Sequence, residues 1–444
     1  MASAAEQLAA NLNLGAFAKA EALKKRIWFT LGALLVYRLG TYIPLPGINT
    51  DALQQAFNNA QNGLLGMFNM FAGGAVSRMA IFALGIMPYI SSSIILQLLT
   101  SIVPTLDALK KEGEQGRKVI NQYTRYGTVL LAALQAYGIA VGLEGSGSIV
   151  LNPGLFFKLT TMVTLTGGTI FLMWLGEQIT SRGIGNGISL IIFSGIVANI
   201  PHALSGTLDL GRQGALPTAI ILLVGVGAVG VIAFIVFIER AQRRLLIQYP
   251  KRQVGNRMFQ GDSSHLPLKL NTSGVIPPIF ASSLLLLPIT LANFSAGHGG
   301  ASWLNTVAAY LGRGQPLYLL LYGGMIIFFA FFYTAVVFNP TDTADNLKKH
   351  GGFIPGIRPG QRTAEYIDYV LTRITAVGAV YLVVVCLLPE FLINTFQVPF
   401  YFGGTSLLIV VSVTMDTVAQ IQGHLLAHQY EGLVKKAKLR GRTR

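Results

Sequence analysis

Apolar runs long enough to cross a membrane recur along the whole chain, separated by short polar or basic segments. An α-helix needs about 20 mainly apolar residues to cross a bilayer. Ten runs of this kind lie at residues 27–43, 79–103, 123–143, 155–175, 184–204, 216–238, 275–294, 317–338, 373–393 and 400–421. The pattern predicts an all-α polytopic membrane protein with ten transmembrane helices and both termini on one side.

One further apolar run is too short to span the bilayer. It covers only Leu64–Val76, and Gly73, Gly74 and Arg78 interrupt the pattern before the next long run begins at Met79. A half-helix that enters a membrane and turns back must be buried in protein or line a cavity, because lipid cannot satisfy its loose backbone groups. The stretch therefore predicts a re-entrant half-helix folded into a cavity.

Composition supports the membrane assignment. The 444 residues are 52% hydrophobic and only 11% charged, with a mean hydropathy of +0.56. An ordinary soluble domain carries about 25% charged residues. The single cysteine, Cys386, cannot form an internal disulfide. The basic flank before the first run resembles that of a signal peptide, but no small-x-small cleavage site follows, which favours an uncleaved first span.

The basic residues are distributed unevenly between the two predicted sides. With ten spans, 28 of the 33 lysines and arginines fall on the side of the N-terminus. The five exceptions are Arg38, Arg78, Lys158, Arg212 and Arg313. Because cytoplasmic segments carry an excess of lysine and arginine, both termini are predicted to be cytoplasmic.

Ten spans divide naturally into two halves of five around the loop that follows Glu239. Halves with an odd number of spans would be inverted relative to each other if they are repeats. No self-similarity is evident in the sequence, so the inverted repeat and two unrelated halves both stay open. The predicted order is a cytoplasmic segment 1–26, an N-terminal half 27–204, a C-terminal half 205–421 with cytoplasmic loops 239–272 and 339–373, and a basic tail 422–444.

Acidic residues are nearly absent from the predicted spans. The few candidates lie at span ends or near the cytoplasmic side: Glu144, Glu177, Glu239, Glu390 and Asp416. Ion-coupled carriers usually need ionisable groups near the midplane, so this pattern argues against a coupled carrier. A secondary transporter of a small solute nevertheless stays an alternative, because Pro277, Pro278 and Pro288 would loosen the seventh span.

No catalytic set is evident in the sequence. His424 and His428 are spaced i, i+4, which would allow a shared metal ion and an intramembrane enzyme, but no carboxylate or thiolate ligand accompanies them. An interfacial role is the other interpretation. The glycine-rich Gly183–Gly187 lacks the lysine of a phosphate-binding loop and is typical of a tight turn between spans.

Two isoleucine pairs and three polar residues each allow either a structural or a functional interpretation. Ile86 with Ile90 and Ile188 with Ile192 each stack on one helix face. They are typical of packing, and they would also suit an apolar constriction that blocks ions by dewetting. The polar residues Gln97, Asn271 and Thr272 either meet across an interface or hold neighbouring helices together.

The two long loops differ in charge. Residues 239–269 carry seven basic and two acidic residues, which suits anionic lipid, an acidic partner or RNA phosphates. The second loop is nearly neutral and presents Arg358 within the turn sequence Gly356–Gly360. Because Arg358 has no evident local partner, contact with another protein is favoured.

Several long motifs resemble the bacterial SecY family, which forms the channel of the general protein-secretion translocon. The match runs from about Lys24 to Lys438. It rests on FNMFAGGAVSRMAIFALGIMPYIS, KKEGEQGRK followed by QYTRYG, FLMWLGEQITSRGIGNGIS, HLPLKLNTSGVIPPIFASS, FNPTDTADNLKKHGGFIPGIRPG and VPFYFGGTSLLIVV.

The resemblance implies two inverted five-helix halves around an hourglass pore. Leu64–Val76 would be a plug, with Leu64, Phe68 and Phe71 in it and with Gly73, Gly74 and Arg78 as its hinge. A lateral gate would open between spans two and three and spans seven and eight, near Gln97, Asn271 and Pro277. The pore ring would consist of Ile86, Ile90, Ile188, Ile192, Ile279 and Ile409.

The resemblance also implies partners. The chain would assemble with SecE and SecG, take energy from the SecA ATPase or a translating ribosome, and accept preprotein signal sequences, with SecDF, YidC and the lipid bilayer as further partners. It implies no cofactor, no metal and no enzymatic activity of the chain itself. Docking would use Arg358, Lys251, Arg252 and Arg257. Asn256 departs from the second arginine of several relatives, which would weaken one contact.

Overall fold

The computed structural model describes residues 21–60, 69, 71–145, 149–213, 217–249, 252–254, 257–259, 263–285, 310, 315–396 and 404–441. Within these residues, seven helices are long and apolar enough to cross a membrane. They are α8 (Glu114–Gly145), α9 (Leu155–Arg182), α10 (Gly187–Arg212), α11 (Thr218–Arg240), α14 (Pro316–Val337), α16 (Gln361–Phe396) and α17 (Gly404–Gly441). The all-α polytopic class is confirmed.

The remaining predicted spans are less regular. Helix α6 (Met87–Ile102) bends by 98° into α7 (Pro104–Lys111), and this pair would be an eighth span. Helix α3 (Glu21–Gly40) has the length of a span, but charged residues in its first turns and Arg38 near its end lower its hydropathy. Of the predicted span 275–294, a helix over Ile276–Leu285 is described and the rest lies outside the described residues. The count of ten therefore stays a prediction.

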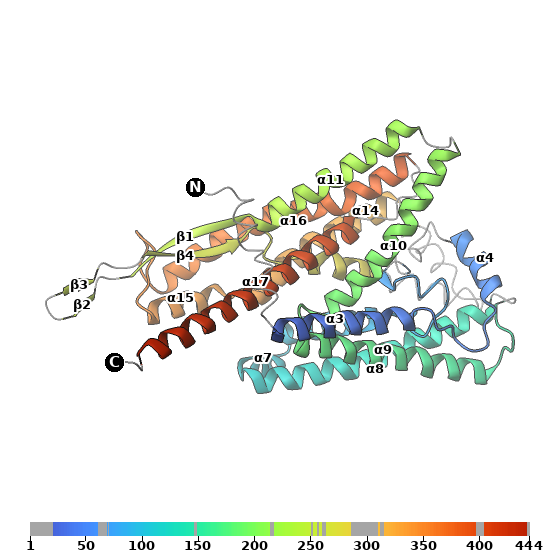
Figure 1. Cartoon of the computed structure of the whole chain (residues 1–444), viewed down its shortest axis with the longest axis horizontal. Coiled ribbons are helices and arrows are strands. Elements are labelled where there is room, and N and C mark those ends of the chain that lie inside the picture. The colour runs from blue at the N-terminus through green and yellow to red at the C-terminus, as the bar shows by residue number, and fades with distance from the viewer. Residues whose placement is uncertain are drawn as a thin grey trace.

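The helices form two bundles that are joined by α10 (Figure 1). Helices α3, α6, α8 and α9 pack together in one bundle, and α11, α14, α16 and α17 in the other. Helix α10 packs against α9 and α3 on one side and against α17 on the other. The short helix α4 (Thr50–Ala60) lies at the opposite end of the molecule from α7 and α15 (Pro340–Lys349).

The largest group of buried apolar side chains in the described part of the chain lies between the bundles. This central cluster draws on α3, α6, α9, α10, α11, α14, α16, α17 and the helix Ile276–Leu285. Its fully buried members include Leu172, Ile179, Ile196, Ile326, Leu382 and Leu408. Because both bundles contribute, this cluster is the main apolar contact that holds them together.

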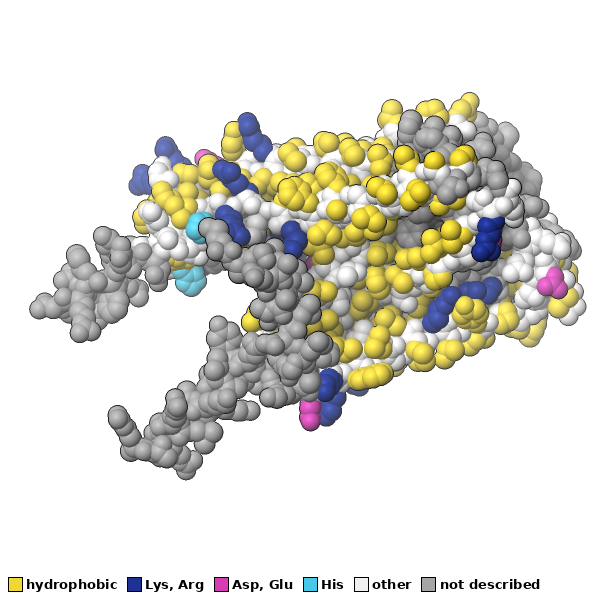
Figure 2. All heavy atoms as spheres, turned by 45° about the horizontal axis from the view of Figure 1, so that its top comes forward, with side chains coloured by type: hydrophobic (Ala, Val, Ile, Leu, Met, Phe, Trp, Pro, Cys, Tyr) yellow, Lys and Arg dark blue, Asp and Glu magenta, His cyan; other side chains and the backbone are white. Residues whose placement is uncertain are grey.

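The outer surface is apolar as well. On α11, Leu222 is 65% exposed and Val226 is 70% exposed. Figure 2 shows hydrophobic side chains over most of the visible face, with basic side chains gathered mainly toward the end of the molecule where α15 lies. Exposed apolar side chains on this scale would be unfavourable in water, so this surface fits contact with lipid.

The region between Phe71 and Ile86 corrects two predictions. Residues 72–79 and 81–86 form turns, so the half-helix does not continue to Val76 and the second span does not begin at Met79. Left-handed backbone at Gly73, Gly74, Met79 and Gly85 interrupts any helix. Helix α6 begins only at Met87, with a proline in its first turn.

The turns between Phe71 and Ile86 satisfy their backbone within the protein. The amide of Leu45 donates to the Met79 carbonyl at 2.9 Å, and the amide of Ile81 donates to the Ile43 carbonyl at 3.0 Å. Ala80 and Ala83 are buried. This agrees with the rule that non-helical backbone at membrane depth must be surrounded by protein.

The basic loop after α11 contains strands that the hydropathy pattern did not predict. Strand β1 (Gln242–Gln248) pairs antiparallel with β4 (Ser263–Lys269), and β2 (Arg252–Val254) pairs with β3 (Arg257–Phe259). Leu245 of β1 is buried with Ile354 and Ile367 of the following loop and α16. A further bridge joins Gln248 to Phe353. The loops 239–272 and 339–373 thus pack together at the end where α7 and α15 lie (Figure 1).

Glycine 168 sets the distance between α9 and the turns that precede α6. A Cβ at Gly168 would lie 2.2 Å from the Ile81 carbonyl oxygen, whereas a Cβ at Gly167 would meet nothing within 4 Å. We expect Gly168→Ala to destabilise the protein by roughly 1–3 kcal/mol, because the turns must shift. Gly167→Ala should be neutral or slightly stabilising, because alanine favours helix. Thermal unfolding in detergent measures the stability of both variants. Equal unfolding midpoints for the two variants would contradict the close packing at Gly168.

Candidate functional site

The six isoleucines predicted to form a ring all lie in the central cluster or against it. Four are buried in the cluster, and Ile188 and Ile279 are partly buried against it. Ile86 ends the turns that precede α6, and the other five come from α6, α10, α17 and the helix Ile276–Leu285, so both bundles contribute. The structure therefore brings Ile86, Ile90, Ile188, Ile192, Ile279 and Ile409 into one continuous apolar region. Many other apolar side chains belong to the same region.

The predicted plug is only partly described. Leu64 and Phe68 lie outside the described residues. Phe71 is 7% exposed and belongs to the central cluster. Helix α10 makes room for it at Gly195, where a Cβ would lie 2.7 Å from the Phe71 carbonyl oxygen. The end of the predicted plug thus packs directly against the helix that carries Ile188 and Ile192.

The predicted hinge is held by two arginines. Arg38 of α3 donates from Nη1 to the Gly73 carbonyl at 2.7 Å, and Arg78 donates from Nη2 to the same oxygen at 3.3 Å. Both glycines have left-handed backbone, with φ of 66° at Gly73 and 82° at Gly74. A side chain at Gly74 would also crowd the Arg78 guanidinium, since a Cβ there would lie 3.0 Å from Nη2.

Tyr42 completes this arrangement. Its hydroxyl accepts a hydrogen bond from Arg38 Nη2 at 2.9 Å. The Arg38 guanidinium lies 4.9 Å from the centre of the Tyr42 ring, and the Arg78 guanidinium lies 4.1 Å from it. Sequence reasoning treated Arg38 only as an exception to the charge asymmetry, and Arg78 both as such an exception and as part of the predicted hinge. That shared exception was the one available signal that they belong together, and it gave no indication of Tyr42.

The predicted gate residues do not meet in this structure. Gln97 donates to Ser93 Oγ at 3.3 Å within α6. Asn271 is buried and donates to Glu239 Oε1 at 2.7 Å. Among the described residues, no hydrogen bond joins Gln97 to Asn271. Asn271 instead binds the end of α11, as expected if its amide holds neighbouring segments together. Pro277 is buried in the first turn of the helix Ile276–Leu285.

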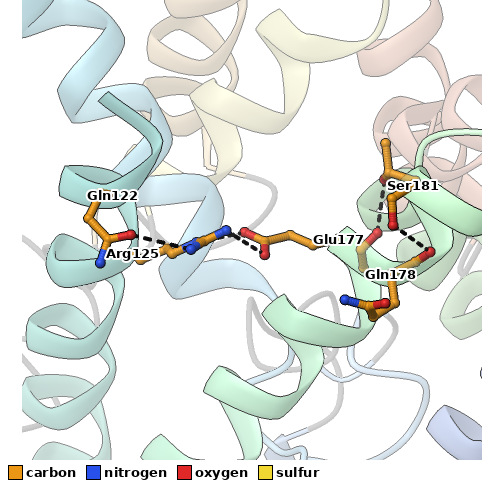
Figure 3. A network of polar contacts seen from close by, with 7 residues as sticks. Gln122, Arg125, Glu177, Gln178 and Ser181 are labelled. Atoms are coloured by element: carbon orange, nitrogen blue, oxygen red, sulfur yellow. Dashed lines mark hydrogen bonds and ion pairs between the residues drawn. The ribbon is translucent and has the colours of Figure 1, made fainter. Parts of the chain in front are cut away.

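A polar network joins α8 to α9 (Figure 3). Arg125 and Glu177 point toward each other, and both carboxylate oxygens accept, from Nε at 2.9 Å and from Nη2 at 2.8 Å. Gln122 accepts a further bond from Arg125 at 3.3 Å. Sequence reasoning placed Glu177 at a span end without a partner. Two-point pairing of this kind fixes orientation as well as distance, so it keeps α8 and α9 in register.

Of the predicted docking residues, Arg358 and the backbone of Arg252 and Arg257 are described, and they belong to the two loops that pack together. Arg358 is exposed in the turn that precedes α16, and its carbonyl accepts from Thr363 Oγ1 at 3.0 Å. Arg252 and Arg257 belong to β2 and β3, but their side chains lie outside the described part, as does Lys251 entirely.

The predicted histidine pair lies on α17. His424 is exposed, and the side chain of His428 lies outside the described residues. Among the described residues, no group of three histidine, cysteine, aspartate or glutamate side chains could hold a metal ion.

Comparison with known proteins gives one consistent result. The sequence model of the SecY family matches residues 80–418. The protein translocase subunit SecY of Escherichia coli strain K12 is 57% identical over 422 residues, which are 94% of this chain and 95% of that protein. The subunit of the same name from Rickettsia bellii is 56% identical over 94% of this chain and 97% of its own length.

Solved structures agree on the fold. A structure described as that of a protein-conducting channel superposes with a TM-score of 0.67 at 18% identity, covering 90% of this chain and 92% of that one. Sec61 in the canine ribosome-channel complex superposes with a TM-score of 0.64 at 17% identity and the same coverage. From the family match and the high identity to bacterial relatives over nearly the whole length, this chain belongs to the SecY family of protein translocase subunits.

Proposed function

We propose that this chain is the central protein-conducting channel of a Sec translocon in the plasma membrane of a bacterium. It passes unfolded preproteins across the membrane and releases hydrophobic segments sideways into lipid. Membership of the SecY family supports this function, and one structural observation carries it. Six isoleucines from both bundles lie in the central cluster or against it, and we assign them to the pore ring: Ile86, Ile90, Ile188, Ile192, Ile279 and Ile409.

An apolar ring suits this task for a physical reason. A channel for unfolded chains must pass every kind of side chain, so groups that bind one kind tightly would trap it. Apolar walls exclude ions by dewetting and hold a moving chain only weakly. Leu64–Val76 acts as the plug, and Gly73, Gly74 and Arg78 form the hinge at its end.

Release into lipid requires the two bundles to separate along one side. The lateral gate lies between α6 and α8 on one side and the helix Ile276–Leu285 and α14 on the other, near Gln97, Asn271 and Pro277. In this structure Gln97 donates within α6, whereas Asn271 donates to Glu239 at the end of α11 and to the Gly274 carbonyl of its own segment. Parting the bundles there would break no hydrogen bond between these two residues, which supports a seam that opens when a signal sequence enters.

Energy comes from partners that dock on the cytoplasmic end. The two packed loops present Arg358 on a turn and the tip residues Lys251, Arg252 and Arg257 to SecA or to a translating ribosome. A ribosome is the stated partner of the Sec61 complex that shares this fold. SecE and SecG complete the channel as small subunits, and SecDF and YidC act with it. Both termini are cytoplasmic, and the chain itself is a passive channel without a cofactor.

Reconstitution tests the function as a whole. Proteoliposomes that contain the chain, SecE, SecG, SecA and ATP should import a signal-bearing preprotein into a protease-protected space. A preprotein that lacks its signal sequence is the matched control and should stay accessible. If instead the chain alone took up a small solute in a saturable, gradient-driven manner and imported no preprotein, the transporter alternative would replace the channel.

The ring predicts a measurable leak. Replacing Ile192 and Ile409 with serine should raise the resting ion conductance of reconstituted channels by about tenfold or more. Each substitution removes roughly 1.5–3 kcal/mol of apolar transfer free energy, and 1.4 kcal/mol corresponds to a factor of ten. Leu222→Ser is the control, because Leu222 is 65% exposed on the outer face of α11. Unchanged conductance in the Ile192 and Ile409 variant would exclude the ring.

Arg358 predicts a defect confined to partner-driven transport. Arg358→Glu should reduce SecA-driven export by at least about tenfold, because loss of a buried interface charge pair costs about 2–5 kcal/mol. Membrane insertion of the channel itself should be unaffected. Arg362→Glu, also exposed in the same loop region, controls for the change in net charge. An equal loss in both variants would indicate a general charge effect and reject a specific contact.

A further inference from the structure

A cavity of about 630 Å³ opens beside Gly74, and Gln54 of α4 contributes to its wall. Its wall contains the two guanidinium groups of Arg38 and Arg78, the Tyr42 ring and polar side chains that include Asn69 and Ser77. Cavities of about 300–1,000 Å³ are typical of small-molecule sites. The cavity is therefore large enough for a ligand, and its most prominent chemistry is cationic.

Among the described residues that line this cavity, no aspartate or glutamate accompanies the two cations. Arg38 and Arg78 converge on a single carbonyl oxygen, that of Gly73, at 2.7 and 3.3 Å. Neither arginine forms an ion pair with any of the residues that the structure describes. Two like charges held this close repel each other, and an anion between them would remove that repulsion.

Donors remain to bind such an anion. A guanidinium group has five N–H donors. Arg38 uses two of its nitrogens, on Gly73 and Tyr42, and Arg78 uses two, on Gly73 and the Thr41 carbonyl. The remaining N–H groups of two arginines match the several oxygens of a phosphate, which arginine binds in a two-point geometry.

We propose that this cavity binds an oxyanion of the phosphate class between Arg38 and Arg78. Two sources can present this chemistry, a free phosphate ion and the phosphate of a lipid headgroup. The surroundings admit the second source, because Tyr42 is 54% exposed and the neighbouring Ile43 is 51% exposed. Apolar side chains beside a cationic cavity allow acyl chains to lie on the surface while the phosphate enters.

Binding at this site is linked to the end of the predicted plug and its hinge. Both arginines hold the Gly73 carbonyl, and Ser77 donates to the Gly74 carbonyl at 2.9 Å. An anion that binds the arginines in this arrangement stabilises the docked segment by mass action. The site therefore extends beyond the channel function proposed above, and its occupancy is measurable without any transport.

The first experiment uses the full chain, purified in mild detergent with any subunits that accompany it. Thermal unfolding is followed while inorganic phosphate, or a short-chain phosphatidylglycerol, is titrated against chloride at constant ionic strength. Saturable stabilisation by inorganic phosphate assigns the site to the free ion. Saturable stabilisation by phosphatidylglycerol alone assigns it to a lipid headgroup. The absence of saturable stabilisation by either overturns the proposal.

Variants locate the site. The double variant Arg38→Gln and Arg78→Gln should weaken binding by at least tenfold, and Arg212→Gln, which removes an exposed arginine of α10, should leave it unchanged. Equal weakening in both would overturn the assignment. Because the double variant can itself loosen the fold, amide hydrogen exchange is also measured on the unmodified chain. Protection of residues 71–80 should rise with the ligand, and unchanged protection there would count against the site.

Discussion

The need to satisfy backbone hydrogen bonds away from water governs the centre of this structure. Between Phe71 and Ile86 the chain is not helical, yet it runs among membrane-spanning helices. Each N–H and carbonyl in such a segment costs several kcal/mol if it is left unpaired. The strand-like contacts with residues 43–45 and the arginine donors at Gly73 meet this need. A segment held by side chains and short bridges can be released more easily than a continuous helix.

Small residues on the surrounding helices make this arrangement possible. Gly168 of α9 and Gly195 of α10 have no side chain where the carbonyls of Ile81 and Phe71 approach. In lipid, where the hydrophobic effect does not drive helices together, such close packing supplies much of the association energy. The turns therefore pack closely against α9 and α10, and α10 also carries Ile188 and Ile192, two of the isoleucines proposed to form the ring.

Polar contacts hold each bundle together internally, whereas apolar contacts join the two bundles. Within the N-terminal bundle, Arg125 and Glu177 pair at two points, and within the other bundle Asn271 binds Glu239. The bundles themselves meet chiefly through apolar side chains of the central cluster. Apolar contacts are non-directional, so they can slide and re-form without leaving unpaired groups. Bundles that are held internally by polar contacts and meet each other through apolar contacts suit a channel that must both seal and open.

The sequence alone determined the class of the protein and most of its helices, because a bilayer demands long apolar runs and these are visible without any tertiary contact. The family motifs likewise indicated which isoleucines belong together. Tertiary contacts decided the rest. The apolar composition between Met79 and Ile86 predicted a helix, but turns that are buried in protein have the same apolar composition. The β1–β4 ribbon depends on the partners Ile354 and Ile367, and the convergence of Arg38 with Arg78 joins residues far apart in the chain. Hydropathy reports how a residue partitions between water and lipid, whereas these features depend on which distant groups come into contact.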